Sequence, residues 1–542
     1  MRDLMQDWPL RVSHILDHAA KYHPRRAVIS RSVEGPITRT SWAEIRLNAL
    51  KCAQALTRLG LAKGDVVGVM AWNTARHLAA WYGVTGAGGV LHTLNPRLFA
   101  DQHAYIINHA EDRFIMVDPD LVPVLERIAD RLPKVARYII LTDRAHMPET
   151  GLRNAVCYEE LLAECDGDFA WVEGDERDAC GICYTSGTTG HPKGVVYTHR
   201  SNVLHALAAN SSDVLGLASV DVVMPVVPLF HANGWALAYT APMAGASLVM
   251  PGRDLMPPAL YELLEMGVTC AAAVPTIWMG LLAHLRANDL KLSSLKRVVI
   301  GGASCPRAVI KAFQEEYGVR VFHAWGMTET SPLGTTASFT PEVAALEPDA
   351  RLDVQTSVGH PPFTVDLRIT DDDHHELPWD GQTQGRLWIR GPGIVRRYLK
   401  AEEDAVGPDN WFDTGDIATI DANGYVRITD RSKDVIKSGG EWISSIELEN
   451  AAVAHPEVAE AAAIGVPHPK WSERPILVVV PRPGKTPTRE DILALVARSV
   501  ASWQVPDDVI FLPDIPHTAT GKISKLELRK KLAEMNYSLP AA

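Results

Sequence analysis

The sequence predicts an α/β protein with a large, multi-subdomain N-terminal domain of α/β layers and a small α/β C-terminal domain. Three observations support this fold class. The chain has 542 residues, which is too long for one ordinary core. Short apolar runs alternate with segments of helical period through most of the chain. Near Gly385 the pattern changes to short alternating runs separated by turns, which adds a small antiparallel unit.

The N-terminal domain is predicted to contain parallel strands with helices between them. Four apolar runs indicate buried strands, at residues 66–70, 114–117, 138–141 and 298–300. Helical periodicity lies between such runs, for example at residues 42–59 and 257–266. This alternation is typical of parallel sheets that are covered by helices.

The C-terminal domain is expected to follow a short charged junction, Asp430-Arg431-Ser432-Lys433-Asp434. The antiparallel unit precedes this junction, with strands expected at 385–391 and 424–430. The residues that follow it predict a domain of their own, with helices at 445–453 and 489–500 and strands at 459–466 and 476–480. The predicted domains are therefore residues 1–430 and 431–542.

Composition and charge restrict the function classes. The net charge of −12 argues against non-specific binding to nucleic acid or an anionic membrane. The longest apolar stretch, residues 78–91, is interrupted by four Gly and a Thr, so no membrane span is expected. Residues 1–11 do not resemble a signal peptide. Seven scattered Cys favour reduced thiols in a cytoplasm, and the Cys180-x-x-Cys183 pair is interpreted as part of a strand.

The strongest local signal is the run Tyr184-Thr-Ser-Gly-Thr-Thr-Gly-His-Pro-Lys-Gly194. Glycines let backbone N–H groups surround an anion, and the hydroxyls and Lys193 add donors and charge. The run is not a Walker A motif, which reads GxxxxGK[ST]. It resembles the phosphate-binding signature of the adenylate-forming superfamily, which includes acyl-CoA synthetases, luciferase-like enzymes and peptide-synthetase adenylation domains. Other parts of that family's pattern follow in the same order, from about residue 30 to residue 531.

The resemblance implies an enzyme that activates a carboxylic acid with ATP and Mg²⁺. It implies an acyl-adenylate and pyrophosphate as first products, and transfer of the acyl group to coenzyme A after the mobile C-terminal domain rotates. Thr328 is expected at the α-phosphate, Glu329 at Mg²⁺, Trp325 on adenine, and Asp416 and Arg431 at the ribose. The full set expected to bind ATP is Thr185, Ser186, Gly187, Thr188, Thr189, Gly190, Lys193, Gly302, Ala303, Ser304, Ala324, Trp325, Gly326, Thr328, Glu329, Asp416 and Arg431.

Further roles also follow from the resemblance. Lys522 is expected to be the catalytic lysine, because a cation between carboxylate and α-phosphate offsets their repulsion. Lys433 is expected to be the hinge of the domain rotation. His231 is expected to act between the acyl site and the thiol tunnel. Residues expected to bind coenzyme A are Ser438, Gly439, Gly440, Glu441 and Trp442, and those expected to line the acyl pocket are His231, Trp235, Gly302, Gly326 and Met327.

The acid is expected to be short to medium in length, because Trp235 is bulky. No Asp in residues 230–235 could pair an amino-acid ammonium. The chain resembles the medium-chain branch and, within it, bacterial ligases that act on 3-methylmercaptopropionate.

The alternatives are an adenylating enzyme that loads a carrier protein or oxidises the adenylate, and a non-catalytic nucleotide-binding module. Carrier loading in cis is not expected, because only 20 residues follow Lys522. The module would lack residues such as Glu329 and Lys522, and both are present. Association into a homodimer is left open.

Overall fold

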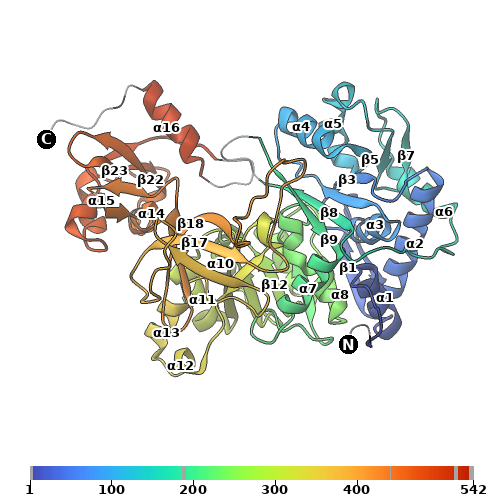
Figure 1. Ribbon diagram of the computed structural model, residues 1–542, viewed down its shortest axis with the longest axis horizontal. Helices are drawn as coiled ribbons and strands as arrows, with labels where there is room; N and C mark the ends of the chain where they lie inside the picture. Colours follow the sequence, from blue (N-terminus) through green and yellow to red (C-terminus); the bar gives the residue numbers. More distant parts are fainter. Residues whose placement is uncertain (1–3, 186–190, 440, 518–522, 536, 538–542) are drawn as a thin grey trace. The chain divides into compact units, whose positions relative to one another are not determined.

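The computed structural model describes residues 4–185, 191–439, 441–517, 523–535 and 537 (Figure 1). These residues form two compact units. The first consists of residues up to 185, 192–366 and 390–412, and the second mainly of residues 367–389 and those from 413 onward. The predicted domains, residues 1–430 and 431–542, are defined by a domain rotation and not by compactness, so their boundary stays a prediction.

The first unit contains an eight-stranded sheet. Its strands from β14 to β1 are parallel, and an antiparallel strand closes each edge. In spatial order the strands are β15 (Leu333–Thr336), β14 (Arg320–Gly326), β13 (Arg297–Ile300), β12 (Cys270–Ala273), β10 (Val222–Pro225), β11 (Ser247–Met250), β1 (Ala27–Arg31) and β2 (Ile37–Ser41).

A second, seven-stranded sheet lies in the same unit and is parallel except for its last strand. That strand forms a hairpin with its neighbour, across the phosphate-loop motif. The order is β7 (Ala155–Cys157), β6 (Arg137–Ile140), β5 (Asp112–Val117), β3 (Val66–Met70), β4 (Val90–Thr93), β8 (Ala179–Tyr184) and β9 (Gly194–Thr198).

Helices cover both faces of the two sheets, because strand residues alternate between two apolar cores. On β13, for example, Val299 lies in the central core while Val298 and Ile300 lie in an outer one. The central core receives α1 (Ser13–Tyr22), α2 (Trp42–Arg58), α3 (Ala75–Gly86), α6 (Tyr158–Ala163), α7 (His199–Ala209) and α8 (Leu237–Met243). The outer cores receive α9 (Pro257–Leu264), α10 (Pro275–Ala287) and α11 (Arg307–Tyr317) on one side, and α4 (Ala100–Ala110) and α5 (Val122–Glu126) on the other.

The second unit contains most of a four-stranded sheet and a five-stranded sheet. The first has the order β16 (Asp366–Thr370), β17 (Gly385–Arg390), β18 (Phe412–Ile420) and β19 (Val426–Arg431). The second has the order β21 (Glu441–Ile443), β20 (Ile436–Ser438), β23 (Ser472–Pro481) and β22 (Val458–His468), with β24 (Asp508–Phe511) also paired to β23. Its helices are α14 (Ser445–Val453), α15 (Arg489–Val496) and α16 (Lys525–Glu534).

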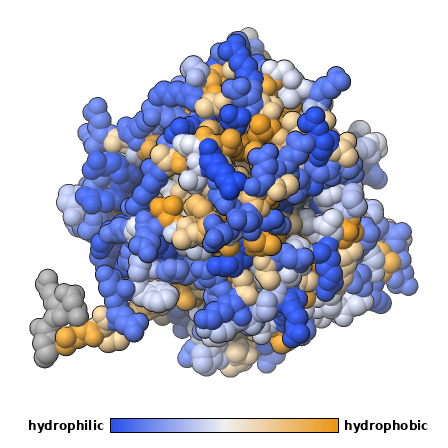
Figure 2. Space-filling view, turned by 90° about the vertical axis from the view of Figure 1, so that its right-hand side faces the viewer, coloured by the Kyte–Doolittle hydropathy of each residue, from blue (hydrophilic) through white to orange (hydrophobic). Residues whose placement is uncertain are grey.

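The remaining helices are short, α12 (Pro341–Ala344) and α13 (Pro348–Gln355). In the described part of the chain, no helix has the length and apolar character needed to cross a membrane. The face seen in Figure 2 is mostly hydrophilic, with apolar residues gathered in small patches. The mixed α/β fold class that the sequence predicts is confirmed.

Candidate active site

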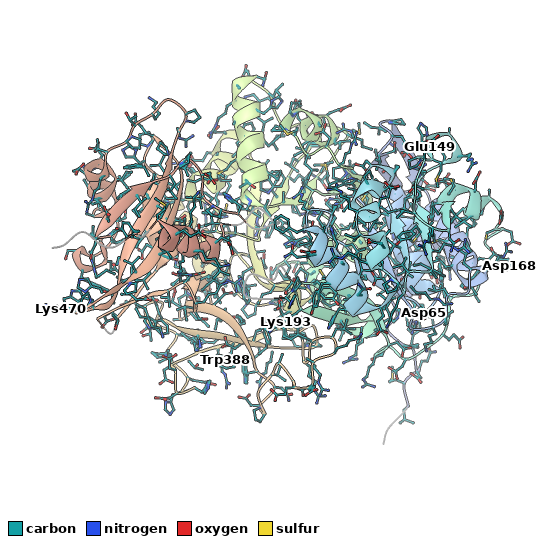
Figure 3. All side chains as sticks on the ribbon, turned by 90° about the horizontal axis from the view of Figure 1, so that it is seen from above. Asp65, Glu149, Asp168, Lys193, Trp388 and Lys470 are labelled. Carbon is teal, nitrogen blue, oxygen red and sulfur yellow. The ribbon has the colours of Figure 1, made fainter. Side chains whose placement is uncertain are left out.

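The phosphate-loop motif joins β8 to β9, and its two ends are hydrogen-bonded to each other. The Thr185 N–H donates to the Lys193 carbonyl at 2.9 Å, and the Lys193 N–H donates to Thr185 Oγ1 at 3.1 Å. Lys193 stands immediately before β9 with an exposed side chain (Figure 3). The other predicted residues of this loop, Ser186, Gly187, Thr188, Thr189 and Gly190, lie outside the described residues.

The second predicted nucleotide motif, Ala324 to Thr330, begins in β14 and continues into the turn after it. Gly326 is required there for steric reasons: a side-chain carbon at that position would lie 1.8 Å from the Pro332 carbonyl oxygen. The Trp325 ring packs on Gly334, where an added carbon would lie 2.3 Å from Trp325 Cζ3. Tyr197 on β9 donates a hydrogen bond of 2.7 Å to the Thr328 carbonyl. That bond connects this motif to the phosphate-loop hairpin.

Glu329 is buried, with 8% of its surface exposed, and one of its carboxylate oxygens is already bonded. The Tyr398 hydroxyl donates to Glu329 Oε1 at 2.8 Å. Lys193 Nζ lies 4.8 Å from the centre of the Tyr398 ring. A carboxylate oxygen is the hard donor that Mg²⁺ prefers, since this ion binds one or two carboxylates together with phosphate oxygens and water. The donor at Glu329 therefore fits a magnesium ion bound with a nucleotide.

Among the residues that the structure describes, two other groups of side chains have the spacing of a cation site, and neither includes Glu329. One consists of Glu34, Asp143 and His146, and the other of Asp371, Asp373 and His375. In the first group the Glu34 carboxylate is already paired with an arginine, because Arg76 Nη1 lies 2.6 Å from Glu34 Oε1. The second group is mostly exposed, and exposed acidic groups are common without a metal, so we assign no metal to either group.

Two of the predicted acyl-pocket residues, His231 and Trp235, lie at an unusual turn. Residues 232–236 all have positive φ, between 41° and 60°. Residues other than Gly and Asn rarely adopt this left-handed conformation, which costs about 1–2 kcal/mol per residue. The turn follows His231 and places the Trp235 ring against Gly301 and Gly302: added carbons at these glycines would lie 3.2 Å and 3.8 Å from the ring.

The two glycines directly follow β13, so they lie at the same sheet edge as the end of β14. Parallel neighbouring strands bring their carboxyl ends to one edge, where ligands bind in open α/β sheets. Gly302 has φ of +79°, and Ala303 and Ser304 after it are exposed. The structure thus brings Trp235 together with Gly301 and Gly302, and an added carbon at Gly301 would lie 3.0 Å from the Ala324 carbonyl oxygen.

The predicted ribose residues form a cross-strand pair in the second unit. Asp416 on β18 is opposite Arg431 on β19, and Arg431 Nε lies 2.9 Å from Asp416 Oδ1. Asp416 is buried, with 2% of its surface exposed. A Gly-Asp pair by itself usually indicates a turn, but Asp416 lies within β18. Its charge is balanced by Arg431, the other residue expected at the ribose.

The residues expected to bind coenzyme A lie at the β20–β21 hairpin, also in the second unit. Ser438 is buried, while Glu441 is exposed and Trp442 is partly buried. Gly439 has φ of +64°, and its N–H donates to the Trp471 carbonyl at 2.9 Å. Burial lowers the pKa of Lys433, the predicted hinge residue. Gly440 and Lys522 lie outside the described residues.

His205 is a site neighbour that the sequence did not indicate. It lies on α7, and its Nε2 accepts the Leu333 N–H at 3.0 Å, just after the second nucleotide motif. Burial lowers the pKa of His205 to about 4, so the ring is neutral at pH 7 and can accept this bond. His205, Tyr197 and Tyr398 were all missed, because each acts through a contact distant in the sequence.

The chain matches the AMP-binding enzyme model over residues 16–399 and the model of the AMP-binding enzyme C-terminal domain over residues 447–522. It therefore belongs to the AMP-binding enzyme family, as the sequence motifs predicted. It is similar to the 3-methylmercaptopropionyl-CoA ligase of Ruegeria lacuscaerulensis, with 49% identity over 531 residues covering 98% of both chains.

Two more distant similarities concern a second curated ligase and a solved structure. A medium-chain-fatty-acid–CoA ligase of Ectopseudomonas oleovorans is 44% identical, over 97% of this chain and 96% of its own length. The crystal structure of the anthranilate CoA ligase AuaEII with anthranoyl-AMP has a TM-score of 0.84 and covers 98% of this chain and 100% of its own. At 24% identity, that last comparison speaks for the fold alone.

Proposed function

We propose that this enzyme is an AMP-forming acyl-CoA synthetase for a short- to medium-chain carboxylic acid, with 3-methylmercaptopropionate as the preferred one. The observation that carries the proposal is the full-length similarity, at 49% identity, to a 3-methylmercaptopropionyl-CoA ligase. The acid's carboxylate attacks the α-phosphorus of ATP and pyrophosphate leaves. The thiol of coenzyme A then attacks the acyl carbonyl, and AMP leaves.

In the first half-reaction the phosphate loop and Lys193 bind the phosphates, and Thr328 contacts the α-phosphate. Trp325 stacks on adenine, and Asp416 with Arg431 binds the ribose. Glu329 offers a carboxylate oxygen to Mg²⁺, which neutralises phosphate charge when bound. The two bonds between Thr185 and Lys193 support this assignment, because they fix the ends of the loop.

The acyl pocket is formed by His231, Trp235, Gly302, Gly326 and Met327. The Trp235 ring against Gly301 and Gly302 supports a short pocket, since an indole fills space that a longer acyl chain would need. A small thioether acid is compatible with such a site. A polarizable sulfur also makes favourable contacts with aromatic rings.

In the second half-reaction the domain 431–542 rotates about Lys433 and brings Ser438–Trp442 to the thiol of coenzyme A. Gly439 supports this role, because a positive φ and the absence of a side chain let the backbone approach a ligand closely. The proposal includes a cytoplasmic location, which the seven buried free cysteines support.

A panel of carboxylic acids tests this function. Purified enzyme is incubated with Mg²⁺, ATP, coenzyme A and one acid, and pyrophosphate and thioester are quantified. We expect both products, with the highest kcat/KM for 3-methylmercaptopropionate. Pyrophosphate without thioester would instead identify an enzyme that loads a carrier or oxidises the adenylate. No pyrophosphate with any acid would identify a nucleotide-binding module.

A further inference from the structure

The segment 393–399 connects the two nucleotide motifs through backbone and side-chain hydrogen bonds. The Val395 N–H donates to the Glu329 carbonyl at 2.8 Å, and the Leu399 N–H donates to the Gly194 carbonyl at 2.8 Å. Ser331 Oγ donates to the Gly393 carbonyl at 2.6 Å. One short stretch of chain therefore touches the turn that carries Glu329 and the strand that follows the phosphate loop.

Within this segment Tyr398 occupies the space between the two motifs. Its hydroxyl donates to Glu329 Oε1, and its ring lies 4.8 Å from Lys193 Nζ. A phenol O–H is a hydrogen-bond donor and a carboxylate is an acceptor, so Tyr398 donates to Glu329 in this contact. The aromatic face attracts the ammonium group of the exposed Lys193 side chain.

We propose that Tyr398 is a positioning residue that sets two charged groups of the nucleotide site at once. By bonding Oε1 it fixes the Glu329 carboxylate and leaves Oε2 as the oxygen for the cation. By holding Lys193 over its ring it keeps the ammonium beside the phosphate loop. This inference rests on the proposed function, because it assumes that Glu329 and Lys193 serve ATP and its divalent ion.

The two halves of the proposal can be separated by substitution. Tyr398→Phe keeps the ring near Lys193 and removes only the hydroxyl, so it tests the Glu329 contact. Tyr398→Leu removes both the hydroxyl and the aromatic face. Tyr22→Phe is the matched control, because Tyr22 lies on α1 and is 62% exposed. Thermal unfolding of each variant establishes that it is folded.

The first experiment measures Mn²⁺ binding by electron paramagnetic resonance, with a non-hydrolysable ATP analogue present and no acid. Removing one hydrogen bond to the Glu329 carboxylate should weaken Mn²⁺ binding by Tyr398→Phe about 2- to 13-fold, in a variant that remains folded. Tyr398→Leu should weaken it at least as much and should also raise the KM for ATP. Tyr22→Phe should match wild type.

Each outcome decides a different point. Unchanged Mn²⁺ binding in Tyr398→Phe would overturn the role at Glu329. Unchanged KM for ATP in Tyr398→Leu, relative to Tyr398→Phe, would overturn the role at Lys193. A lower melting temperature without either change would make Tyr398 purely structural. Failure of the wild-type enzyme to bind the Mn²⁺–nucleotide pair would instead contradict the proposed function.

Discussion

At the scale of single residues, Lys522 should separate the two half-reactions. In the proposed mechanism Lys522 bridges carboxylate and α-phosphate, so Lys522→Ala should lower acyl-adenylate formation at least about 10²- to 10³-fold. Thioester formation from supplied acyl-adenylate should survive, because the proposed rotation carries Lys522 away. Both rates are measured separately, with Lys530→Ala on α16 as a control whose side chain is 60% exposed. Equal losses in a folded Lys522→Ala variant would refute this role.

Trp235 should set the length of the acid. Trp235→Ala removes the ring that packs on Gly301 and Gly302, and we expect the preferred acid to become longer. Each methylene that fits should change the free energy of transition-state binding, obtained from kcat/KM, by about 1–3 kcal/mol. Wild type should act poorly on palmitate. The measurement is kcat/KM against chain length in both forms. Trp379→Ala, at an exposed Trp, is the control, and a parallel drop across all lengths would indicate lost stability instead.

His205 should make the enzyme sensitive to acid. Its pKa is about 4 in the folded chain, below the ordinary value of 6.5, so the fold favours the neutral ring. The resulting stability is fully present above pH 6.5. It is lost as the pH falls towards 4, by about 1.4 kcal/mol per pH unit. Denaturant unfolding at several pH values should show a shallower loss for His205→Gln, which accepts the Leu333 N–H without titrating. Identical slopes would contradict this contribution.

At the scale of elements, the end of β14 should not tolerate a side chain at Gly326, the last residue of this strand. An added carbon would lie 1.8 Å from the Pro332 carbonyl oxygen, so the backbone must move. Gly326→Ala should destabilise the protein by about 1–3 kcal/mol and abolish ATP–pyrophosphate exchange. Gly280→Ala is the control: it lies within α10, and the nearest atom would be 3.5 Å away. We expect that variant to be stabilised by about 0.5–1 kcal/mol.

Elements with a strong local pattern could be predicted from the sequence. The apolar run 66–70 is β3, and the predicted helix 445–453 is α14 with the same bounds. The antiparallel unit was only half predicted, because just two of its four strands alternate clearly. β18 was missed: its run Phe412–Ile420 contains a Gly-Asp pair that by itself indicates a turn.

The parts of the site that could not be predicted depend on contacts between residues distant in the sequence, or on unfavourable backbone conformations. Tyr197 and Thr328 are 131 positions apart, and Tyr398 and Glu329 are 69 apart, so no local spacing reveals either pair. The left-handed turn at 232–236 was missed for another reason. Ala, Trp and Ala at three of its positions disfavour positive φ, and only surrounding packing can impose it.

At the scale of the whole molecule, Lys433 should control the exchange between the two half-reactions. Hinge residues absorb large φ/ψ changes, and proline fixes φ near −65°. Lys433→Pro should therefore keep one half-reaction and lose the other, while Lys433→Ala keeps both. Adenylate formation and thioester formation are assayed separately in each variant. Wild-type rates for both halves in Lys433→Pro would show that the pivot lies elsewhere.

The left-handed turn also determines how this enzyme can be engineered for new acids. A library that randomises residues 232–236 together would consist mostly of misfolded members, because all five positions have positive φ. Diversity is better introduced at Trp235 alone, and at Met327, a second proposed acyl-pocket residue whose backbone has an ordinary φ. Screening effort would then go to variants that fold, and substrate range would be sampled separately from stability.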